Sequence, residues 1–499
     1  MNFPKRLLTV LAICAFLWVV VRAWNQAITI DEADTYLAHA SSRSLGFPHP
    51  NNHVLNTRLI RFSTRAFGVS AFTLRIPALL GAVVYLWAVV RLCRLLSAQW
   101  FVQALLFLSL VLNPLVGDFL VAARGYGLAL GFLMLGIVYA AERLLPAPGP
   151  QTWTFCAIPS ACFGISFSAN FSFAFVDAAA MAAVFLAAWK MRSAALPKLL
   201  AASALPAIAM TWLITRSTIF EFPTDQLWYG AKSLRETFRT VAEGSLYRPN
   251  PDFLSPEIVA FLDSIQPVLL PFLLLASVAC TGALVIARTR DWRLHFAAAL
   301  VGITAVALGI HWIAYRTSGL LLPQDRTAIY LPPLLTAAAG SILAISGLSF
   351  YSRLLRGVQV TAFVLLGSYF LACLRTDHFK EWIWDSESDR TYAILACLNH
   401  EYQVRDITSI WMYVSVLKFY QAGSRGREDF QSIIDWRDNP PPTQVYVVNH
   451  LFDQNIIADK RLTLIYQGPS NVAIGVTPEL AGKLQPSACL EAAGVTPRE

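Results

Sequence analysis

Long apolar segments alternate with short polar loops over the first three quarters of the chain. Eleven of these segments are close to the ~20 residues that a helix needs to cross a bilayer. They are residues 7–24, 72–95, 100–120, 125–142, 153–169, 171–190, 199–215, 264–287, 294–315, 327–348 and 355–375. The pattern predicts an α-helical polytopic membrane protein with about eleven transmembrane helices.

Basic residues set the predicted orientation of these helices. Lys5 and Arg6 precede the first apolar segment, which has no convincing cleavage site and is typical of an uncleaved signal anchor. With that end in the cytoplasm, alternation places the basic loops on the same side, as the positive-inside rule requires. These loops carry Arg91, Arg94, Arg143, Lys190, Arg192, Lys198, Arg288, Arg290, Arg293, Arg353 and Arg356. We therefore expect a cytoplasmic N-terminus in the cytoplasmic (inner) membrane.

The remaining polar segments fall on the outer face. They are residues 25–71, residues 216–262 and the tail 376–499. The tail has helical patterns at 385–398 and 410–422, a proline break at 440–442, and strand-like runs at 444–449, 462–466 and 472–476. The sequence thus predicts a transmembrane catalytic domain over residues 1–375 and a small α/β C-terminal domain in the periplasm or outside the cell.

Composition agrees with this organisation. The chain is 56% hydrophobic and 14% charged, with a mean hydropathy of +0.52, which excludes a soluble globular protein. The net charge of +8 comes mostly from the short loops, so no nucleic-acid partner is predicted. Six of the eight cysteines lie in or beside apolar spans. Cys397 and Cys489 lie in the tail, and the sequence leaves open whether they form a disulfide.

Three carboxylates lie within four residues directly after the first span. They are Asp31, Glu32 and Asp34. Acidic groups at this position lose solvation, so a function or a partner is expected for them. Thr29 and Glu32 have the spacing of a capping box, which predicts a helix over residues 30–40 with Glu32 folded back and Asp31 outside the cap. The alternative is that all three only favour the helix N-terminus through its dipole.

A second outer helix is predicted over residues 52–67. Its arginines and its apolar residues form separate stripes, which is typical of a helix in the membrane surface. The stripes are Arg58, Arg61 and Arg65, and Leu55, Leu59, Phe62 and Ala66. The arginines would meet either ordinary lipid head groups or the phosphate of a lipid-linked substrate. His49 and His53 are four apart, but His49 lies between prolines, so no metal site is predicted.

Further polar residues lie near the same outer surface. Asp118, Arg124 and Tyr126 lie where the third span turns into the fourth. Arg316, Asp325 and Arg326 precede the tenth span, and Asp177 lies inside the sixth. Each alone is more often part of a structural ion pair than a catalyst. Their common side of the membrane is what indicates a site.

The order of these motifs resembles that of a known family. The motifs are Asp31-Glu32, residues 67–77 leading into the second span, Asn113-Pro114, and Ala123-Arg124-Gly125-Tyr126. They are similar to those of the lipid-sugar-dependent glycosyltransferases of the GT-C superfamily, particularly the branch of protein O-mannosyltransferases and lipid A aminoarabinose transferases. The resemblance covers residues 1–220 and is carried beyond them by span number and by Asp325-Arg326.

The resemblance implies roles for the site residues. Asp31 takes the place of the family's catalytic base and Asp118 that of its second acidic position, with Glu32 beside the base. The candidate substrate-binding residues are His53, Arg58, Arg61, Arg124, Tyr126 and Arg326. The Pro48–His53 run departs from the His-Pro-Pro-Leu-Tyr-like run of relatives, which leaves the role of His53 open.

The predicted enzyme is therefore an inverting glycosyltransferase. Its donor is a polyprenyl-phosphate sugar, and its acceptor is a lipid, glycan or protein hydroxyl. Such a donor is already activated, so no nucleotide, phosphate loop or other cofactor is predicted; a divalent metal remains open. Asp31 would take the acceptor proton while Arg58, Arg61 or Arg326 balances the phosphate charge.

Two other classes of protein also fit part of the pattern. A secondary transporter or lipid flippase also uses intramembrane Asp and Arg, but the chain shows no repeat between two halves and its outer segments are asymmetric. A membrane-anchored assembly scaffold would use the tail as a binding module and need no active site. A transporter would show counterflow or lipid translocation without loss of the sugar, and a scaffold would tolerate the loss of Asp31.

Overall fold

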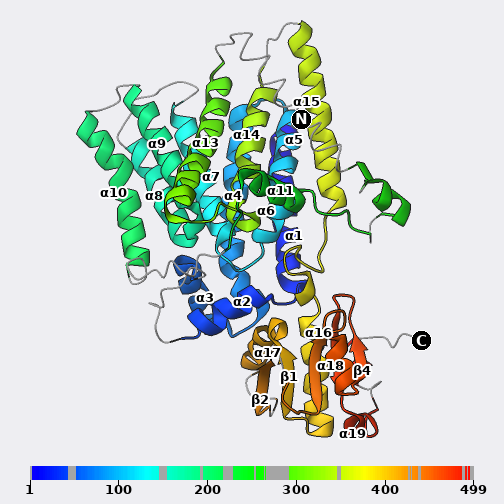
Figure 1. The fold of residues 1–499 in the computed structure, drawn as a ribbon. Helices are drawn as coiled ribbons and strands as arrows, with labels where there is room; N and C mark the ends of the chain where they lie inside the picture. The colour runs from blue at the N-terminus through cyan, green and yellow to red at the C-terminus, as the bar shows by residue number, and fades with distance from the viewer. Residues whose placement is uncertain are drawn as a thin grey trace. The chain divides into compact units, whose positions relative to one another are not determined.

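The computed structural model forms two compact units, each built from separate stretches of chain (Figure 1). The helical unit contains Met1–Val21, Gly46–Asn56 and Pro77–Arg375, and the mixed unit contains Arg22–Leu45, Thr57–Ile76 and Thr376–Glu499. The structure describes residues 3–42, 52–144, 154–190, 195–216, 229–251, 254–262, 264–265, 291–345, 350–424, 428, 430–436, 440–485, 489–491 and 493–494.

Helices make up the helical unit and confirm a multi-pass membrane protein. Six of the described helices are long and apolar enough to cross a bilayer. The predicted span 264–287 lies almost wholly outside the described residues, and the structure does not fix the number eleven. The helices are α1 (Phe3–Asn25), α4 (Ala71–Leu96), α5 (Trp100–Val111), α6 (Pro114–Phe119), α7 (Tyr126–Leu144), α8 (Thr154–Ala169), η2 (Phe171–Phe173), α9 (Ala174–Lys190), α10 (Leu196–Thr215), α11 (Leu234–Ser245), α13 (Trp292–Ser318), η4 (Asp325–Ala328), α14 (Leu331–Leu343) and α15 (Phe350–Ala372).

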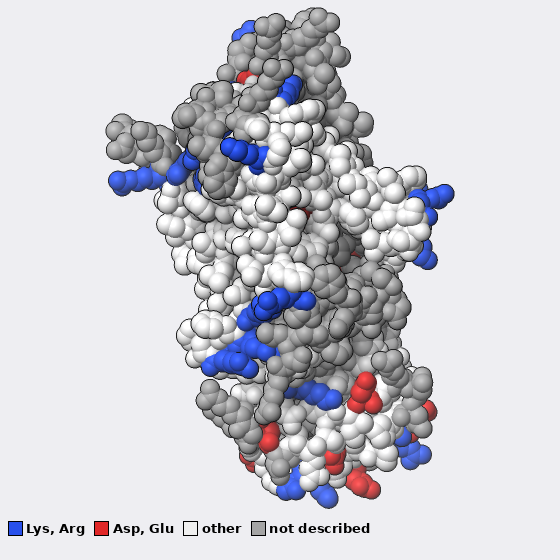
Figure 2. All heavy atoms as spheres, turned by 90° about the vertical axis from the view of Figure 1, so that its left-hand side faces the viewer, with Lys and Arg blue, Asp and Glu red and all other residues white. Residues whose placement is uncertain are grey.

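Small residues allow close helix packing in this unit. A Cβ on Gly164 of α8 would lie 2.5 Å from the carbonyl oxygen of Ala207 on α10, and one on Gly81 of α4 would lie 2.5 Å from the backbone nitrogen of Leu128 on α7. The outer surface is apolar, and Leu205 and Ile208 of α10 are each 60% exposed. Figure 2 shows a wide area without charged side chains over the helices of this unit, as contact with lipid requires.

The third predicted span, residues 100–120, is broken in two. Pro114 has no backbone N–H and starts the new helix α6, a position that proline tolerates. Asn113 caps that helix by accepting a hydrogen bond from the Val116 N–H at 3.2 Å. The break places Asp118 on a short buried helix instead of at the end of a long span.

The mixed unit is built on a five-stranded sheet with the order β2-β1-β3-β5-β4. The first three strands in this order are parallel, and β5 and β4 are antiparallel to their neighbours. The strands are β1 (Asp406–Ile410), β2 (Ser432–Trp436), β3 (Val445–Asn449), β4 (Thr463–Gln467) and β5 (Val472–Val476). The helices of this region are η5 (Ile383–Asp385), α16 (Ser388–Tyr402), α17 (Trp411–Gly423), α18 (Gln454–Asp459) and α19 (Pro478–Ala481).

This sheet confirms a small α/β C-terminal domain. The predicted helices correspond to α16 and α17, and the predicted strand-like runs to β3, β4 and β5. The sequence missed β1 and β2, the parallel pair that α17 joins as a crossover. Strand β1 has the sequence Asp-Ile-Thr-Ser-Ile, and its Thr408 and Ser409 are fully buried. Because these side chains are polar, the hydrophobic pattern did not predict a buried strand here.

The segment after α1 packs on the C-terminal part of the same unit. It forms α2 (Ile30–Asp34), the π-helix η1 (Thr35–Ala40) and, after a gap, α3 (Val54–Phe67). Helix α17 contacts both α2 and η1, and the Tyr36 and Phe419 rings meet edge to face at 5.6 Å. The predicted helix over residues 30–40 thus exists, but its second half is a π-helix, a form frequent at functional sites.

A disulfide joins Cys397 of α16 to Cys489, which answers the question that the sequence left open. Replacing both residues with serine is expected to lower the free energy of unfolding by about 2–5 kcal/mol, because the bond closes a long loop in the unfolded chain. Thermal unfolding under non-reducing conditions measures this, with Cys14→Ser at an exposed free cysteine as the control. An unchanged melting temperature would contradict the prediction.

Candidate functional site

The acidic motif begins with a complete capping box on α2. The N–H of Glu32 donates to Thr29 Oγ1 at 3.2 Å, and the N–H of Thr29 donates to Glu32 Oε2 at 3.1 Å. Glu32 therefore folds back to the helix start, as predicted from the spacing of the two residues.

Glu32 also forms a buried ion pair with Arg75 of α4. Arg75 Nε donates to Glu32 Oε1 at 3.0 Å and Nη2 to Oε2 at 2.7 Å, and both side chains are 0% exposed. The same guanidinium donates to three carbonyl oxygens at the end of α1, those of Ala23 at 3.2 Å, Gln26 at 2.6 Å and Ala27 at 2.7 Å. Such bidentate, charge-assisted contacts fix geometry. Arg75 thus fastens the acidic motif to the end of α1, and a catalytic role for Glu32 stays a prediction.

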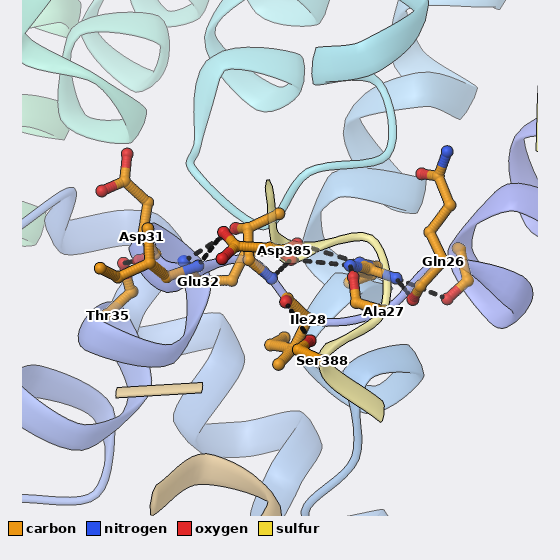
Figure 3. A network of polar contacts seen from close by, with 12 residues as sticks. Gln26, Ala27, Ile28, Asp31, Glu32, Thr35, Asp385 and Ser388 are labelled. Atoms are coloured by element: carbon orange, nitrogen blue, oxygen red, sulfur yellow. Dashed lines mark hydrogen bonds and ion pairs between the residues drawn. The ribbon is translucent and has the colours of Figure 1, made fainter. Parts of the chain in front are cut away.

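Asp31 precedes this pair in the chain but points elsewhere. Figure 3 shows its carboxylate directed away from the cluster of contacts around Glu32. The side chain is half-buried, and its backbone carbonyl accepts a hydrogen bond from Thr35 Oγ1 at 2.8 Å. The motif therefore divides into a carboxylate that holds the structure, on Glu32, and one presented from the helix start, on Asp31.

A carboxylate that the sequence analysis missed lies beside this motif. Asp385 of η5 accepts a hydrogen bond from the Ile30 N–H at 2.7 Å across 355 residues of sequence, and it is 3% exposed (Figure 3). Burial raises the pKa of Asp385 well above its ordinary value. The hydrogen bond from Ile30 opposes this shift, and the charges of Asp31, Glu32 and Asp34 add to it. The sequence placed Asp385 at the start of a predicted helix, and this position did not indicate a contact with Ile30.

Further hydrogen bonds fix the chain just before Ile30. Ser388 Oγ donates to the Ile28 carbonyl at 3.1 Å, and the Ile28 N–H donates to Tyr420 Oη at 3.0 Å. Gln26 Nε2 donates to the His378 carbonyl at 2.8 Å. The C-terminal region therefore positions the backbone that carries Asp31. The sequence of this region did not predict that role.

Replacing Asp385 with asparagine is expected to remove part of the pH dependence of stability. Because the pKa of Asp385 is raised in the folded state, the folded protein binds more protons than the unfolded chain at pH values above the ordinary pKa of 3.8. The contribution of Asp385 to the free energy of unfolding is therefore lost as pH rises. The amide oxygen still accepts from Ile30, but the variant cannot ionise. Melting temperatures across pH should therefore fall less steeply for Asp385→Asn than for wild type or the exposed control Asp459→Asn. Identical profiles would contradict this.

Arg61, one of the three arginines of the predicted stripe, donates its hydrogen bonds to backbone carbonyls. Its Nε donates to the Ala40 carbonyl at 3.0 Å and its Nη2 to that of His39 at 3.2 Å, with a further contact to the Ser42 carbonyl. These contacts tie α3 to the end of η1. Arg58 is half-buried, and its Nε has no hydrogen-bond partner among the residues that the structure describes. Arg58 is therefore the better candidate for an anionic ligand.

The second half of the predicted apolar stripe of α3 is exposed, with Phe62 and Ala66 at the surface, while Leu55 and Leu59 are half-buried. Phe62 is 71% exposed and Phe67, at the helix end, is 68% exposed. Ile60 and Thr64 fill the buried side. This arrangement is the one expected for a helix whose apolar face enters a membrane surface.

In the helical unit, a second group of candidates comes together around Tyr126. Its ring lies 5.6 Å from that of His53 and 4.8 Å from that of Phe119, which follows Asp118 on α6. Asn56 Nδ2 donates to the Ala123 carbonyl at 2.9 Å, which joins the start of α3 to the loop before α7. Asp118, Arg124, Tyr126 and His53 are all buried. The structure thus brings these four predicted residues into one neighbourhood.

The remaining candidates are less closely gathered. Arg326 lies on η4, which packs against α6, and its guanidinium stacks over the Tyr229 ring at 4.4 Å. Tyr229 Oη in turn donates to Asp325 at 3.3 Å. Arg316 stacks over Trp312, and Asp177 is buried in α9. Across the described part of the chain no three His, Cys, Asp or Glu side chains form a metal site, and His49 lies outside that part.

Comparison with solved structures identifies the fold. The structure of ArnT from Cupriavidus metallidurans bound to undecaprenyl phosphate is similar over 95% of this chain and 98% of ArnT, with 10% identity and a TM-score of 0.53. The chain has a GT-C fold. The structure of the arabinofuranosyltransferase AftD from Mycobacteria aligns with 95% of this chain and 40% of AftD, with 13% identity and a TM-score of 0.48. No family model and no curated protein sequence matches the chain.

Proposed function

We propose that this GT-C protein is a membrane glycosyltransferase that moves a sugar from a polyprenyl-phosphate donor to a hydroxyl group on a lipid, a glycan or a protein. The observation that carries the proposal is the difference between the two carboxylates of the acidic motif. Arg75 holds Glu32 and Asp385 holds the Ile30 N–H, while the Asp31 carboxylate is directed away from Glu32 and Asp385 in Figure 3. The GT-C fold and the undecaprenyl phosphate in the ArnT structure support the donor class.

In the proposed reaction Asp31 is the general base. Its carboxylate takes the proton of the acceptor hydroxyl as that oxygen attacks the anomeric carbon of the donor sugar. The bond between this carbon and the phosphate oxygen breaks, and the polyprenyl phosphate leaves with the bonding electrons. A single displacement inverts the anomeric centre. Glu32 is a positioning residue in this scheme, because both of its oxygens are occupied by Arg75 and the cap.

A cation must balance the charge that develops on the leaving phosphate. Arg58 belongs to the same unit as Asp31 and offers an Nε without a hydrogen-bond partner among the described residues. We propose that Arg58 binds the donor phosphate in preference to Arg61, because the Arg61 guanidinium already donates to backbone carbonyls. Substrate contacts by Asp118, Arg124, Tyr126, His53 and Arg326 remain part of the proposal.

The proposed location is the outer face of the cytoplasmic membrane. The basic loops of the sequence support an N-terminus in the cytoplasm, and the disulfide between Cys397 and Cys489 supports an oxidising compartment for the C-terminal region. Both observations support a location of the acidic motif outside the cytoplasm, where a lipid-linked sugar would meet its acceptor.

A reconstituted assay separates this proposal from the transporter and scaffold alternatives. Purified protein in proteoliposomes is given polyprenyl-phosphate donors with a labelled sugar, together with a membrane and envelope extract as the source of acceptor. A transferase moves the label into a new covalent product. A flippase moves the intact donor between leaflets, and a scaffold does neither. Donor translocation without a new product would overturn the proposal.

A further inference from the structure

A groove in the helical unit lies between α7, α9 and α13 and is separate from both groups of candidate site residues. It has a volume of about 300 Å³. Its walls are apolar and are formed mainly by small side chains on α9 and by larger ones on α13, among them Ala183, Ala187, Phe296 and Ile303. The small residues of α9 leave the space open.

The groove is charged at one end only. Lys190 is the last residue of α9, and His295 lies in the first turn of α13, so these two exposed side chains line the same end. All other lining residues are Ala, Ile, Val, Leu or Phe, and no acidic residue is among them. The predicted topology puts this end at the cytoplasmic surface.

An apolar groove that ends at basic side chains is complementary to an amphiphile with an anionic head group. We propose that the groove binds an anionic phospholipid, with one acyl chain against Ala183, Ala187 and Ile303 and its phosphate between Lys190 and His295. The charge complementarity at one end selects the head group, and the cytoplasmic leaflet supplies anionic lipids. This site is independent of the proposed sugar transfer, since it shares no residue with it.

Lipid retention by the full-length protein tests this proposal. Native mass spectrometry of protein released from nanodiscs compares phosphatidylglycerol with phosphatidylcholine of equal chain length. Wild type is expected to retain phosphatidylglycerol preferentially. The double variant Lys190→Gln, His295→Gln should bind it about fivefold or more weakly, whereas Lys198→Gln, at an exposed lysine on α10 outside the groove, should bind like wild type.

A second variant tests the channel without touching the charges. Ala183→Leu with Ala187→Leu fills the groove, so phosphatidylglycerol should be lost although Lys190 and His295 remain. Equal retention of the two lipids by wild type would overturn the proposal, as would unchanged binding in the filled groove or an equal loss in Lys198→Gln. Preferential retention of undecaprenyl phosphate over phosphatidylglycerol would assign the groove to a polyprenyl carrier and likewise overturn it.

Discussion

Replacing Asp31 with asparagine is expected to slow sugar transfer by about 10²- to 10⁴-fold while the protein remains folded. The amide keeps the size of the side chain but cannot take the proton of the acceptor hydroxyl. The capping box of α2 is made by Thr29 and Glu32, and the buried ion pair by Glu32 and Arg75, so both should stay intact in Asp31→Asn. Initial rates of label transfer measure the effect, and thermal unfolding checks the fold.

Asp34 supplies the matched control. It lies on the same short helix three residues further on, has the same side chain and is exposed. Asp34→Asn should transfer sugar at close to the wild-type rate. A rate for Asp31→Asn within a few-fold of that control would remove Asp31 as the base.

Replacing Arg75 with methionine is expected to lower the free energy of unfolding by about 3–5 kcal/mol, because it leaves the Glu32 carboxylate buried without its cation. It also removes the donors to the carbonyls of Ala23, Gln26 and Ala27. We expect lower yield, a lower melting temperature and loss of transfer activity, since the segment that presents Asp31 loses its attachment to α1.

Neutralising Glu32 in the same chain should recover part of this loss. In Arg75→Met with Glu32→Gln neither charge of the buried pair remains, and the glutamine can still accept the hydrogen bond from Thr29. The double variant should therefore melt above the single variant. Arg65→Met, at an exposed arginine of α3, is the control for removing a cation. A melting temperature for Arg75→Met equal to that of this control would show that the buried pair does not stabilise the fold.

The parts of this site that the sequence predicted are those encoded by local spacing. Thr29 and Glu32 are three residues apart, so a capping box can be inferred without knowing the fold, and α2 has it. The stripes of α3 follow from helical periodicity in the same way, and the exposure of Phe62 agrees with them. Asp31 was singled out because it lies in such a local motif directly after a span.

Contacts between distant segments could not be inferred in this way. Asp385 meets Ile30 across 355 residues, and nothing in the residues around either position specifies the other. Arg75 lay within a motif noted in the sequence, but its role as partner of Glu32 depends on how α4 packs against the end of α1. Strand β1 was missed because Thr408 and Ser409 are buried by the tertiary structure despite their polarity.

The phosphorus atom of the donor reports directly on whether Asp31 acts as the base in sugar transfer. A polyprenyl-phosphate sugar is a phosphodiester, and transfer of the sugar leaves a phosphomonoester, which ³¹P NMR distinguishes. With acceptor extract present, we expect reconstituted wild-type protein to convert diester to monoester and Asp31→Asn not to do so. Monoester formation at equal rates by both proteins, or none by folded wild type across a panel of polyprenyl-phosphate donors, would contradict it.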